Sequence, residues 1–145
     1  METRPLTKVD YGKIVSVIDH WWEGPTSALA HPIFFYELGQ LARVVEVEDD
    51  LVGFLFGFIA SGSQVGYVHL VGIHPDFRRR GVARLLYTAF EDDCRSAGCT
   101  GLKAITTHGN VGSVRFHQAL GWSVREVEDY AGPGRSRIVF EKPLG

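Results

Sequence analysis

Residues 68–98, "VHLVGIHPDFRRRGVARLLYTAFEDDCRSAG", decide the fold, because they read as a strand, a short loop and a helix. The strand pattern ends at His74-Pro75, since proline cannot extend a sheet ladder. From Val82 onward the apolar residues recur at helical spacing, at positions 82, 85, 86, 89, 90, 94 and 97, and Gly98 stands where a left-handed helix stop belongs. We therefore predict a strand over Tyr67–Ile73 and a helix from Val82 to Gly98.

The sequence on either side of this unit shows further strand and helix patterns. A short first strand precedes an amphipathic helix over Tyr11–Trp22, with Asp10 as its cap. The other patterns are strands over Ala42–Val47, Val52–Ala60, Thr100–Thr107, Trp122–Val127 and Arg137–Phe140, and a helix over Val111–Leu120 closed by Gly121. Hairpin strands followed by strand and helix units are typical of an α/β (α+β) fold with a mixed sheet.

The composition is that of one folded domain. The chain has 145 residues, 45% hydrophobic and 22% charged, so we expect a single domain over residues 1–145. The net charge of −2 argues against a nucleic-acid partner, because domains that bind nucleic acid are usually strongly basic. No stretch approaches the ~20 apolar residues of a membrane span. We therefore expect a cytoplasmic protein with no membrane partner.

Neither the cysteines nor the histidines show a metal-binding pattern. Cys94 and Cys99 match no zinc or redox spacing, and we expect both thiols to be reduced. The six histidines contain no H-x-x-x-H or H-E-x-x-H spacing. We therefore expect no metal cofactor.

The loop before the predicted helix has the features of an anion site. A strand, loop and helix gather unpaired backbone N–H groups on the positive end of the helix dipole, where phosphate groups bind. Gly81 lets the backbone approach a ligand closely, and Ala83 is also small. Four arginines add positive charge: Arg78, Arg79, Arg80 and Arg84. An arginine run alone is more often a solvated surface, but the order R-x-x-G-x-A at this place favours an anion cradle.

These residues resemble the acetyl-CoA-binding core of the GCN5-related N-acetyltransferases. The family signature is Gln or Arg, two residues, Gly, one residue, then Gly or Ala, and residues 78–83 match it. Residues 110–122, "NVGSVRFHQALGW", resemble the second family motif, which begins with Asn and ends in Tyr-x-x-x-Gly-Phe. The resemblance covers roughly residues 52–127. It implies a mostly antiparallel twisted sheet, helices on both faces, and strands splayed at the acetyl-CoA site.

The resemblance also implies how acetyl-CoA would be held as the acyl donor. The backbone of Val71 and Ile73 would pair with the pantetheine arm, and N–H groups from Arg79 to Arg84 would hold the pyrophosphate. Asn110 would bond to the pantetheine arm, with Phe116 packed beside it. The implied cofactor residues are Val71, Gly72, Ile73, Arg78, Arg79, Arg80, Gly81, Val82, Ala83, Arg84, Asn110, Ser113 and Phe116.

The attacking amine needs a proton acceptor. An alkylamine has a pKa of about 10, so freeing its lone pair at pH 7 costs on the order of 4 kcal/mol, and a base or a water chain must take the proton. Many family members have a carboxylate before the Asn motif, where this chain has Ile105. The candidate is His69, with Tyr67 in the first place of the His-x-His arrangement of the aromatic-amine branch. Alternation along the strand predicts that Tyr67, His69 and Val71 share one face.

Other roles for these residues stay open. His69 could equally be a structural histidine hydrogen-bonded within the sheet, and Glu37 is a weaker alternative base. The leaving thiolate, with a pKa of about 8.5, benefits from an acid without requiring one. The family's tyrosine in that role corresponds to His117, whose N–H can donate to sulfur. His117 is therefore the candidate acid, with a packing role as the alternative.

The acceptor is expected to bind against the aromatic stretch "HPIFFYEL", residues 31–38, because apolar and aromatic concavities bind small ligands. The candidate substrate residues are Trp22, His31, Phe34, Phe35 and Glu37. Packing of this stretch in the core is the alternative.

We expect an acetyl-CoA-dependent N-acetyltransferase acting on the primary amine of a small molecule, such as an amino acid, an arylalkylamine or a polyamine, by direct attack in a ternary complex. The alternatives are a catalytically weak CoA-binding sensor or interaction module, and a protein N-terminal or lysine acetyltransferase. The resemblance also implies a homodimer as one assembly.

Overall fold

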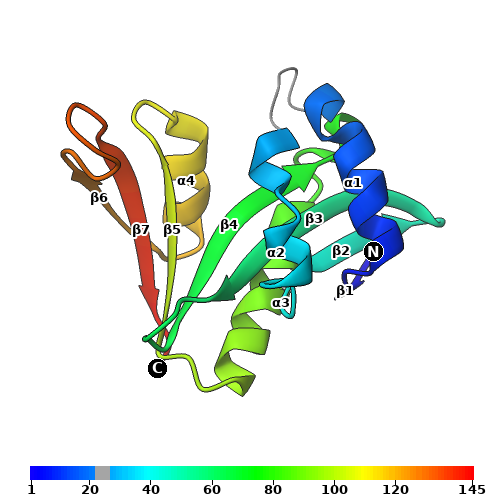
Figure 1. Ribbon diagram of the computed structural model, residues 1–145, viewed down its shortest axis with the longest axis horizontal. Helices are drawn as coiled ribbons and strands as arrows, with labels where there is room; N and C mark the ends of the chain where they lie inside the picture. Colours follow the sequence, from blue (N-terminus) through cyan, green and yellow to red (C-terminus); the bar gives the residue numbers. More distant parts are fainter. Residues whose placement is uncertain (22–26) are drawn as a thin grey trace.

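The computed structural model describes residues 1–21 and 27–145, and within them the strands form one seven-stranded sheet (Figure 1). The order across the sheet is β1-β2-β3-β4-β5-β7-β6, and neighbouring strands are antiparallel except β4 and β5, which are parallel. The bounds are β1 Glu2–Pro5, β2 Arg43–Val47, β3 Asp50–Ile59, β4 Val65–Ile73, β5 Gly101–Thr107, β6 Ser123–Val127 and β7 Arg137–Pro143. This sheet confirms the predicted fold class.

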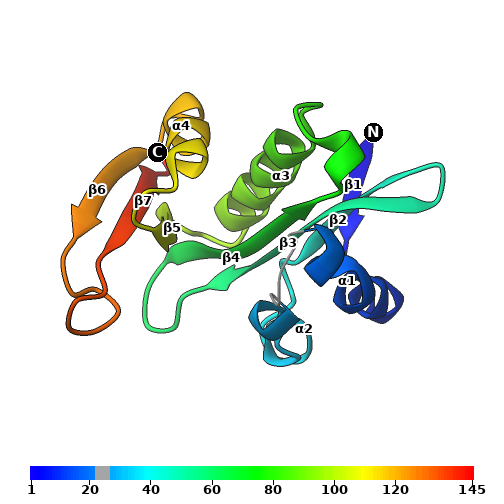
Figure 2. The same ribbon diagram turned by 90° about the horizontal axis from the view of Figure 1, so that it is seen from above.

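Helices cover both faces of the sheet, as predicted. Figure 2 shows α1 and α2 on one face and α3 and α4 on the other. Their bounds are α1 Lys8–Trp21, α2 Ile33–Tyr36, α3 Val82–Ser96 and α4 Val111–Ala119, with short 3-10 helices η1 Ser27–Ala30 and η2 Pro75–Phe77. Each face has its own hydrophobic core, one under α3 and one under α1.

α3 is held against the sheet by a buried stripe that lies over small residues. The stripe consists of Val82, Leu86, Phe90 and Cys94. A Cβ at Gly53 would lie 2.6 Å from Val82, and one at Gly66 would lie 2.3 Å from Cys94, so these glycines allow the close approach of the helix. The predicted strand, loop and helix are confirmed, since β4 ends at Ile73 and α3 begins at Val82.

β4 and β5 pair only at their beginnings. The parallel pairing runs from Val65 with Gly101 to Val68 with Ala104. Beyond this point the two strands diverge (Figure 1), while β4 continues to pair with β3 on its other side. The predicted splay is therefore present, and it leaves one edge of β4 without a strand partner.

A β-bulge lies in β4 at the point where the splay begins. Phe56 of β3 pairs with Leu70 and Gly57 pairs with Val68, so His69 is an extra residue without a partner in β3. A bulge of this kind changes which side chains face which side of the sheet. Accordingly Val68 packs in the core under α3, whereas Leu70 packs in the core under α1.

The bulge corrects one prediction about the candidate base. Tyr67 contacts Phe58, and His69 contacts Phe34 of α2, so both side chains lie on the α2 side of the sheet. Val71 instead packs with the core under α3. The prediction that Tyr67, His69 and Val71 share one face is wrong, because simple alternation does not continue through a bulge.

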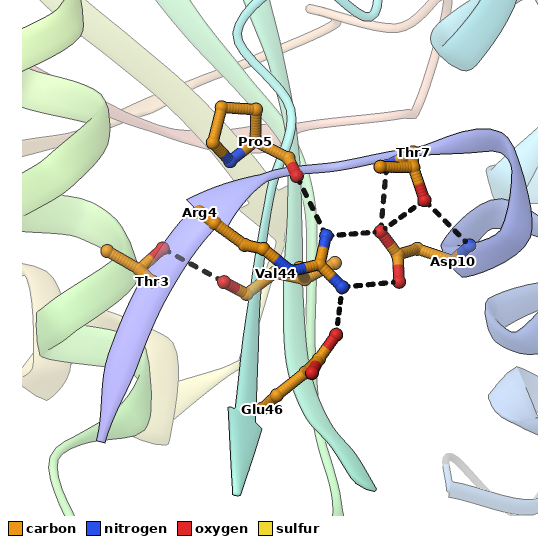
Figure 3. Close-up of polar contacts among 7 residues, drawn as sticks. All are labelled: Thr3, Arg4, Pro5, Thr7, Asp10, Val44 and Glu46. Atoms are coloured by element: carbon orange, nitrogen blue, oxygen red, sulfur yellow. Dashed lines mark hydrogen bonds and ion pairs between the residues drawn. The ribbon is translucent and has the colours of Figure 1, made fainter. Parts of the chain in front are cut away.

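The start of α1 also differs from the prediction. The helix begins at Lys8, so Asp10 lies in its first turn instead of preceding it as a cap (Figure 3). The Asp10 carboxylate accepts hydrogen bonds from the N–H and hydroxyl of Thr7 at 2.7 and 2.8 Å, and from the two terminal nitrogens of Arg4 at 2.7 and 2.9 Å. Arg4 also pairs with Glu46. Thr7 is therefore the capping residue, with Asp10 as the acidic partner of a capping box.

Candidate active site

A cleft of about 260 Å³ lies where β4 and β5 separate. It is lined by Val68, His69, Leu70, Val71, Tyr87, Ala104, Ile105, Thr106, Asn110, Ser113 and His117. The fold thus brings together five residues that the sequence proposed for the site: His69 and Val71 from β4, and Asn110, Ser113 and His117 from the start and body of α4. The free edge of β4 forms part of this cleft, and such an edge can bind an extended ligand arm as an added strand.

One end of the cleft region is the phosphate cradle, defined as residues 78–84. Gly81 is the N-cap of α3 with φ +82°, and it provides no side-chain cap for the first N–H groups of the helix. A Cβ at Gly81 would meet nothing within 4 Å, so the space in front of the helix is open. Exposed N–H groups, the helix dipole and open space together fit a pyrophosphate.

Two of the cradle's four arginine side chains contact other parts of the protein. Arg78 donates to the carbonyl oxygen of Trp21 at 2.7 Å, and Arg80 lies 5.1 Å from the centre of the Phe77 ring. Arg84 lines a separate polar pocket between α3 and α4. Arg79 has a left-handed backbone, with φ +64°. The backbone of the cradle is therefore the part that is available to an anion, and the arginines surround it with positive charge.

Asn110 caps α4 at the rim of the cleft. Its side-chain oxygen accepts from the N–H of Ser113 at 3.2 Å, and its amide donates to the hydroxyl of Thr106 at 3.0 Å. Phe116, also expected at the cofactor, packs edge-on against Tyr87 at 5.0 Å between ring centres and does not line the cleft. Asn110, Ser113 and His117 are therefore the residues of this motif that line the cleft.

One ring nitrogen of His69 forms a hydrogen bond, and the other can accept a proton. Its Nε2 lies 2.7 Å from the carbonyl oxygen of Leu29, and its ring stacks on Phe34 at 3.7 Å. A carbonyl only accepts, so the neutral ring carries its proton on Nε2 and its lone pair on Nδ1. Burial lowers the pKa of His69, although the bond to Leu29 opposes this shift. His69 is therefore neutral at pH 7, with a nitrogen able to take a proton.

His117 is buried, and both of its ring nitrogens are engaged. Nδ1 lies 2.8 Å from the carbonyl oxygen of Ser113, and Nε2 lies 3.0 Å from the hydroxyl of Tyr87. Burial lowers the pKa of His117, with the Ser113 bond opposing, and burial strongly raises the pKa of Tyr87. Sequence reasoning missed Tyr87. The available signals were its place at the edge of the α3 stripe and the absence of the family's hydroxyl at position 117.

An aromatic wall extends from His69 on the α2 side of the sheet. Phe34, Phe58 and Tyr67 form it by ring contacts, and Tyr130 joins it near Tyr67, whose ionisation it affects. The Phe34 and Phe58 ring centres are 6.2 Å apart, and those of Phe58 and Tyr67 are 5.3 Å apart. Burial, assisted by Tyr130, raises the pKa of Tyr67. Lys103 lies 5.1 Å from the centre of the Tyr130 ring. Phe58 and Lys103 were not predicted from the sequence, whereas Tyr130 belongs to a glycine- and proline-rich loop, residues 129–135, that the sequence offered as a possible part of the acceptor pocket.

The other predicted substrate residues are spread around this region. Phe35 stacks on Tyr11 at 5.3 Å, and His31 uses Nδ1 to accept from the N–H of Ile33 at 3.1 Å. Glu37 lines a different cavity, next to Ile59 and Ala97. Trp22 lies outside the described residues. Of the predicted set, Phe34 is therefore the residue that the structure places against His69.

Residues 1–21 and 27–145 contain no helix long and apolar enough to cross a membrane. They also contain no group of three or more His, Cys, Asp or Glu side chains arranged to hold a metal ion.

The model of the acetyltransferase (GNAT) family matches residues 14–122. The chain therefore belongs to this family, and the enzyme class is that of the acetyl-CoA-dependent N-acetyltransferases. The predicted resemblance is confirmed.

Relatives and solved structures agree with this assignment. An acetyltransferase of Yersinia enterocolitica is 24% identical over 147 residues, covering 98% of this chain and 99% of the relative. A GNAT-family structure from Desulfovibrio desulfuricans has a TM-score of 0.86 at 15% identity and covers 99% of both chains. The yncA structure from Salmonella typhimurium, solved with acetyl-CoA, has a TM-score of 0.75 at 17% identity, over 99% of this chain and 94% of that one. At these identities the structures show the fold alone.

Proposed function

We propose that the protein transfers the acetyl group of acetyl-CoA to the primary amine of a small molecule, by direct attack in a ternary complex formed within one domain of residues 1–145. One observation carries this proposal: the cleft between β4 and β5 joins a free strand edge to His69, and the phosphate cradle follows at the end of β4. Acetyl-CoA supplies an activated thioester in this reaction and is consumed as a substrate.

Acetyl-CoA would bind mainly to backbone groups of the protein. The free edge of β4, from Leu70 to Ile73, would pair with the pantetheine arm, and Asn110 and Ser113 would contact the arm from α4. The N–H groups around Gly81 would hold the pyrophosphate. The same β4 backbone is suited to donate an N–H to the thioester oxygen, which gains negative charge when the amine attacks.

The acceptor amine would bind mainly to side chains of the protein. The amine would approach from the α2 side, where Nδ1 of His69 accepts the proton that an ammonium must lose before attack. The aromatic wall beside His69 favours a small acceptor with an apolar or flat body. Amino acids, arylalkylamines and polyamines are all candidates for this place. The homodimer and the cytoplasmic location stay predictions.

Direct attack is supported by the state of the two thiols. Cys94 is fully buried under α3, and burial together with the neighbouring Cys99 raises the pKa of the Cys94 thiol to about 12. A thiol that stays protonated is a poor nucleophile, so Cys94 is not suited to carry the acetyl group, and Cys99 is buried after the end of α3. Alanine at both positions should leave turnover intact if the fold is retained.

The test is release of the CoA thiol when the purified protein is mixed with acetyl-CoA and a panel of amines. The panel contains small amines of each class, peptides with free N-termini and peptides with a lysine. Release above background with small amines supports the proposal. Binding of acetyl-CoA without release from any mixture would identify a sensor instead, and release only with peptides would identify a protein acetyltransferase.

A further inference from the structure

Tyr87 contributes to the cleft from α3, at a position outside both the signature of residues 78–83 and the second motif of residues 110–122. It belongs to α3, lines the cleft with Asn110 and His117, and is only 8% exposed. Its hydroxyl lies 3.0 Å from Nε2 of His117, which stands where the second motif normally has a tyrosine. The phenol lost from α4 is therefore replaced at the same cleft by a phenol from α3.

The direction of the hydrogen bond between these residues follows from the Ser113 carbonyl. That oxygen can only accept, so Nδ1 of the neutral His117 ring carries the proton and Nε2 carries the lone pair. The hydroxyl of Tyr87 therefore donates to Nε2. The lone pairs of the Tyr87 oxygen remain free to accept, and His117 can take one more proton on Nε2.

Aromatic rings pack around this pair and hold it in place. His117 stacks on Phe140 with 3.8 Å between ring centres, and Trp122 lies edge-on to both His117 and Tyr87. Phe116 packs on the remaining side of Tyr87. Hydrogen bonds in such apolar surroundings are strong and well oriented.

Charged groups line the pocket between α3 and α4 that Tyr87 also lines. Arg84 and Glu91 of α3 and Lys142 of β7 line that pocket together with Tyr87. Glu91 is already paired with Lys142 at 2.8 Å and with Arg95 at 2.7 Å. The pair therefore has no carboxylate of its own among the residues that line the cleft.

We propose that Tyr87 passes a proton from the attacking nitrogen to the leaving sulfur, with His117 holding that proton between the two steps. The inference rests on the proposed function and assigns a residue to the second proton of the reaction. His69 would accept the first proton, which leaves the ammonium before attack.

The second proton can be followed through each bond that forms or breaks. When the amine nitrogen bonds to the thioester carbon, the nitrogen becomes positively charged and acidic. Its proton moves to the Tyr87 oxygen while the Tyr87 hydroxyl proton moves to Nε2 of His117, giving an imidazolium. When the C–S bond breaks, its electron pair stays on sulfur; Tyr87 protonates the sulfur, and Nε2 returns its proton to Tyr87. The products are the amide and the CoA thiol, and no other reactant is needed.

The first test is Tyr87→Phe, with Thr88→Ala at the next, exposed position of α3 as the control that also removes a hydroxyl group. Loss of a proton-transfer group should lower kcat by about 100-fold. The KM for acetyl-CoA and its Kd by calorimetry should stay unchanged, because the ring still fills its place. A Tyr87→Phe protein that folds, binds acetyl-CoA and turns over like the control would overturn the inference.

The second test separates proton delivery from packing. An aryl thioacetate releases a more acidic thiol, which needs no protonation to leave. With this donor the ratio of wild-type to Tyr87→Phe turnover should shrink toward one. An equal deficit with both donors would mean that Tyr87 does not deliver a proton to the leaving sulfur, which contradicts the inference.

The third test concerns His117. In His117→Gln the amide oxygen can still accept from Tyr87, but it cannot hold a proton, so kcat should fall as far as in Tyr87→Phe. Nitrogen NMR of the wild-type ring should show a proton on Nδ1, and Tyr87→Phe should shift the Nε2 signal. Full turnover in His117→Gln, or a ring protonated on Nε2, contradicts the inference.

These outcomes differ from a failure of the proposed function. A wild-type protein that binds acetyl-CoA and never releases the thiol contradicts the proposed function, and the inference falls with it. Wild-type turnover with fully active Tyr87 and His117 variants contradicts the inference alone.

Discussion

The two sides of the candidate site are built in different ways. On the cofactor side, the cradle and the free edge of β4 present backbone groups, whose geometry depends on Gly81 and on the first turn of α3. On the acceptor side, His69 and the aromatic wall come from separate elements and depend on contacts between side chains. Binding through backbone groups should tolerate substitution of side chains but not a change of backbone conformation. Binding and catalysis through side chains should depend instead on the identity of those side chains.

The largest effect is expected from Gly81→Val. Its φ of +82° is costly for a β-branched residue, and the new side chain would fill the open space in front of the helix. Losing two charge-assisted hydrogen bonds of about 1.5 kcal/mol each weakens binding about 100-fold. Calorimetry with acetyl-CoA measures this loss. Alanine at Arg79 or at Arg80 should weaken the binding free energy of acetyl-CoA by less than about 1 kcal/mol, because exposed charges usually contribute little.

A matched control is available in Gly62→Val. Gly62 lies between β3 and β4 with φ +74° and also has nothing within 4 Å of an added Cβ. Both variants should lose similar thermal stability, but only Gly81→Val should lose acetyl-CoA. Equal affinity of the two variants, or a larger loss from the arginine changes, would show that the cradle binds through side chains.

A smaller effect, confined to turnover, is expected from His69→Gln. The glutamine amide can still donate to the Leu29 carbonyl, but it offers no basic nitrogen. We expect kcat to fall about 100-fold with acetyl-CoA affinity unchanged. Burial places the pKa of His69 below its ordinary value of about 6.5, so wild-type kcat should rise with pH through a pKa below 6.5 and then level off.

The control for this variant is His20→Gln, on the exposed face of α1. It should keep both the rate and the pH profile of the wild type. If His69→Gln weakens acetyl-CoA binding as strongly as it slows turnover, the two sides of the site are not separate in the way the geometry indicates. If it keeps the wild-type profile, His69 is a structural histidine of the sheet.

The same contrast explains what could be predicted from the sequence. The strand, loop and helix that carry the cradle were predictable because they are encoded locally, by Gly81 and by an apolar period that marks the start of α3. The fold class followed from strand and helix patterns for the same reason. Boundaries at the ends of elements, such as the start of α1 before Asp10, depended on a hydrogen-bond choice between Thr7 and Asp10 that the pattern does not settle.

The rest required contacts between distant segments. The bulge at His69 results from the register of β4 against β3, and it reversed the predicted relation between His69 and Val71. The pairing of Tyr87 with His117 joins two helices across the cleft. The aromatic wall likewise joins α2, β3, β4 and the loop before β7. None of these contacts leaves a periodic signal in the chain.

The smallest effect on turnover is expected from Asp10→Asn, which lies in neither side of the site (Figure 3). Burial opposes ionisation of Asp10, but the hydrogen bonds from Arg4 and Thr7 outweigh it and hold the pKa below its ordinary value. The NH2 group of an asparagine would face the N–H groups of Arg4 and Thr7, which are also donors, so hydrogen bonds would be lost. The free energy of unfolding should therefore fall by about 2 kcal/mol. Denaturant titration measures this loss, and kcat/KM should remain that of the wild type.

The pH dependence of stability gives the sign of the Asp10 contribution. Because the folded pKa is lowered, the contribution is fully present above the unfolded pKa of about 3.9 and is lost as the pH falls through the folded pKa. The difference in unfolding free energy between wild type and Asp10→Asn should therefore be constant near neutral pH and shrink below about pH 4. A difference that persists unchanged in acid would mean that packing, and not the ion pair with Arg4, anchors the start of α1. A loss of turnover at neutral pH would show that the acceptor side depends on this anchor, which would remove the separation between scaffold and site.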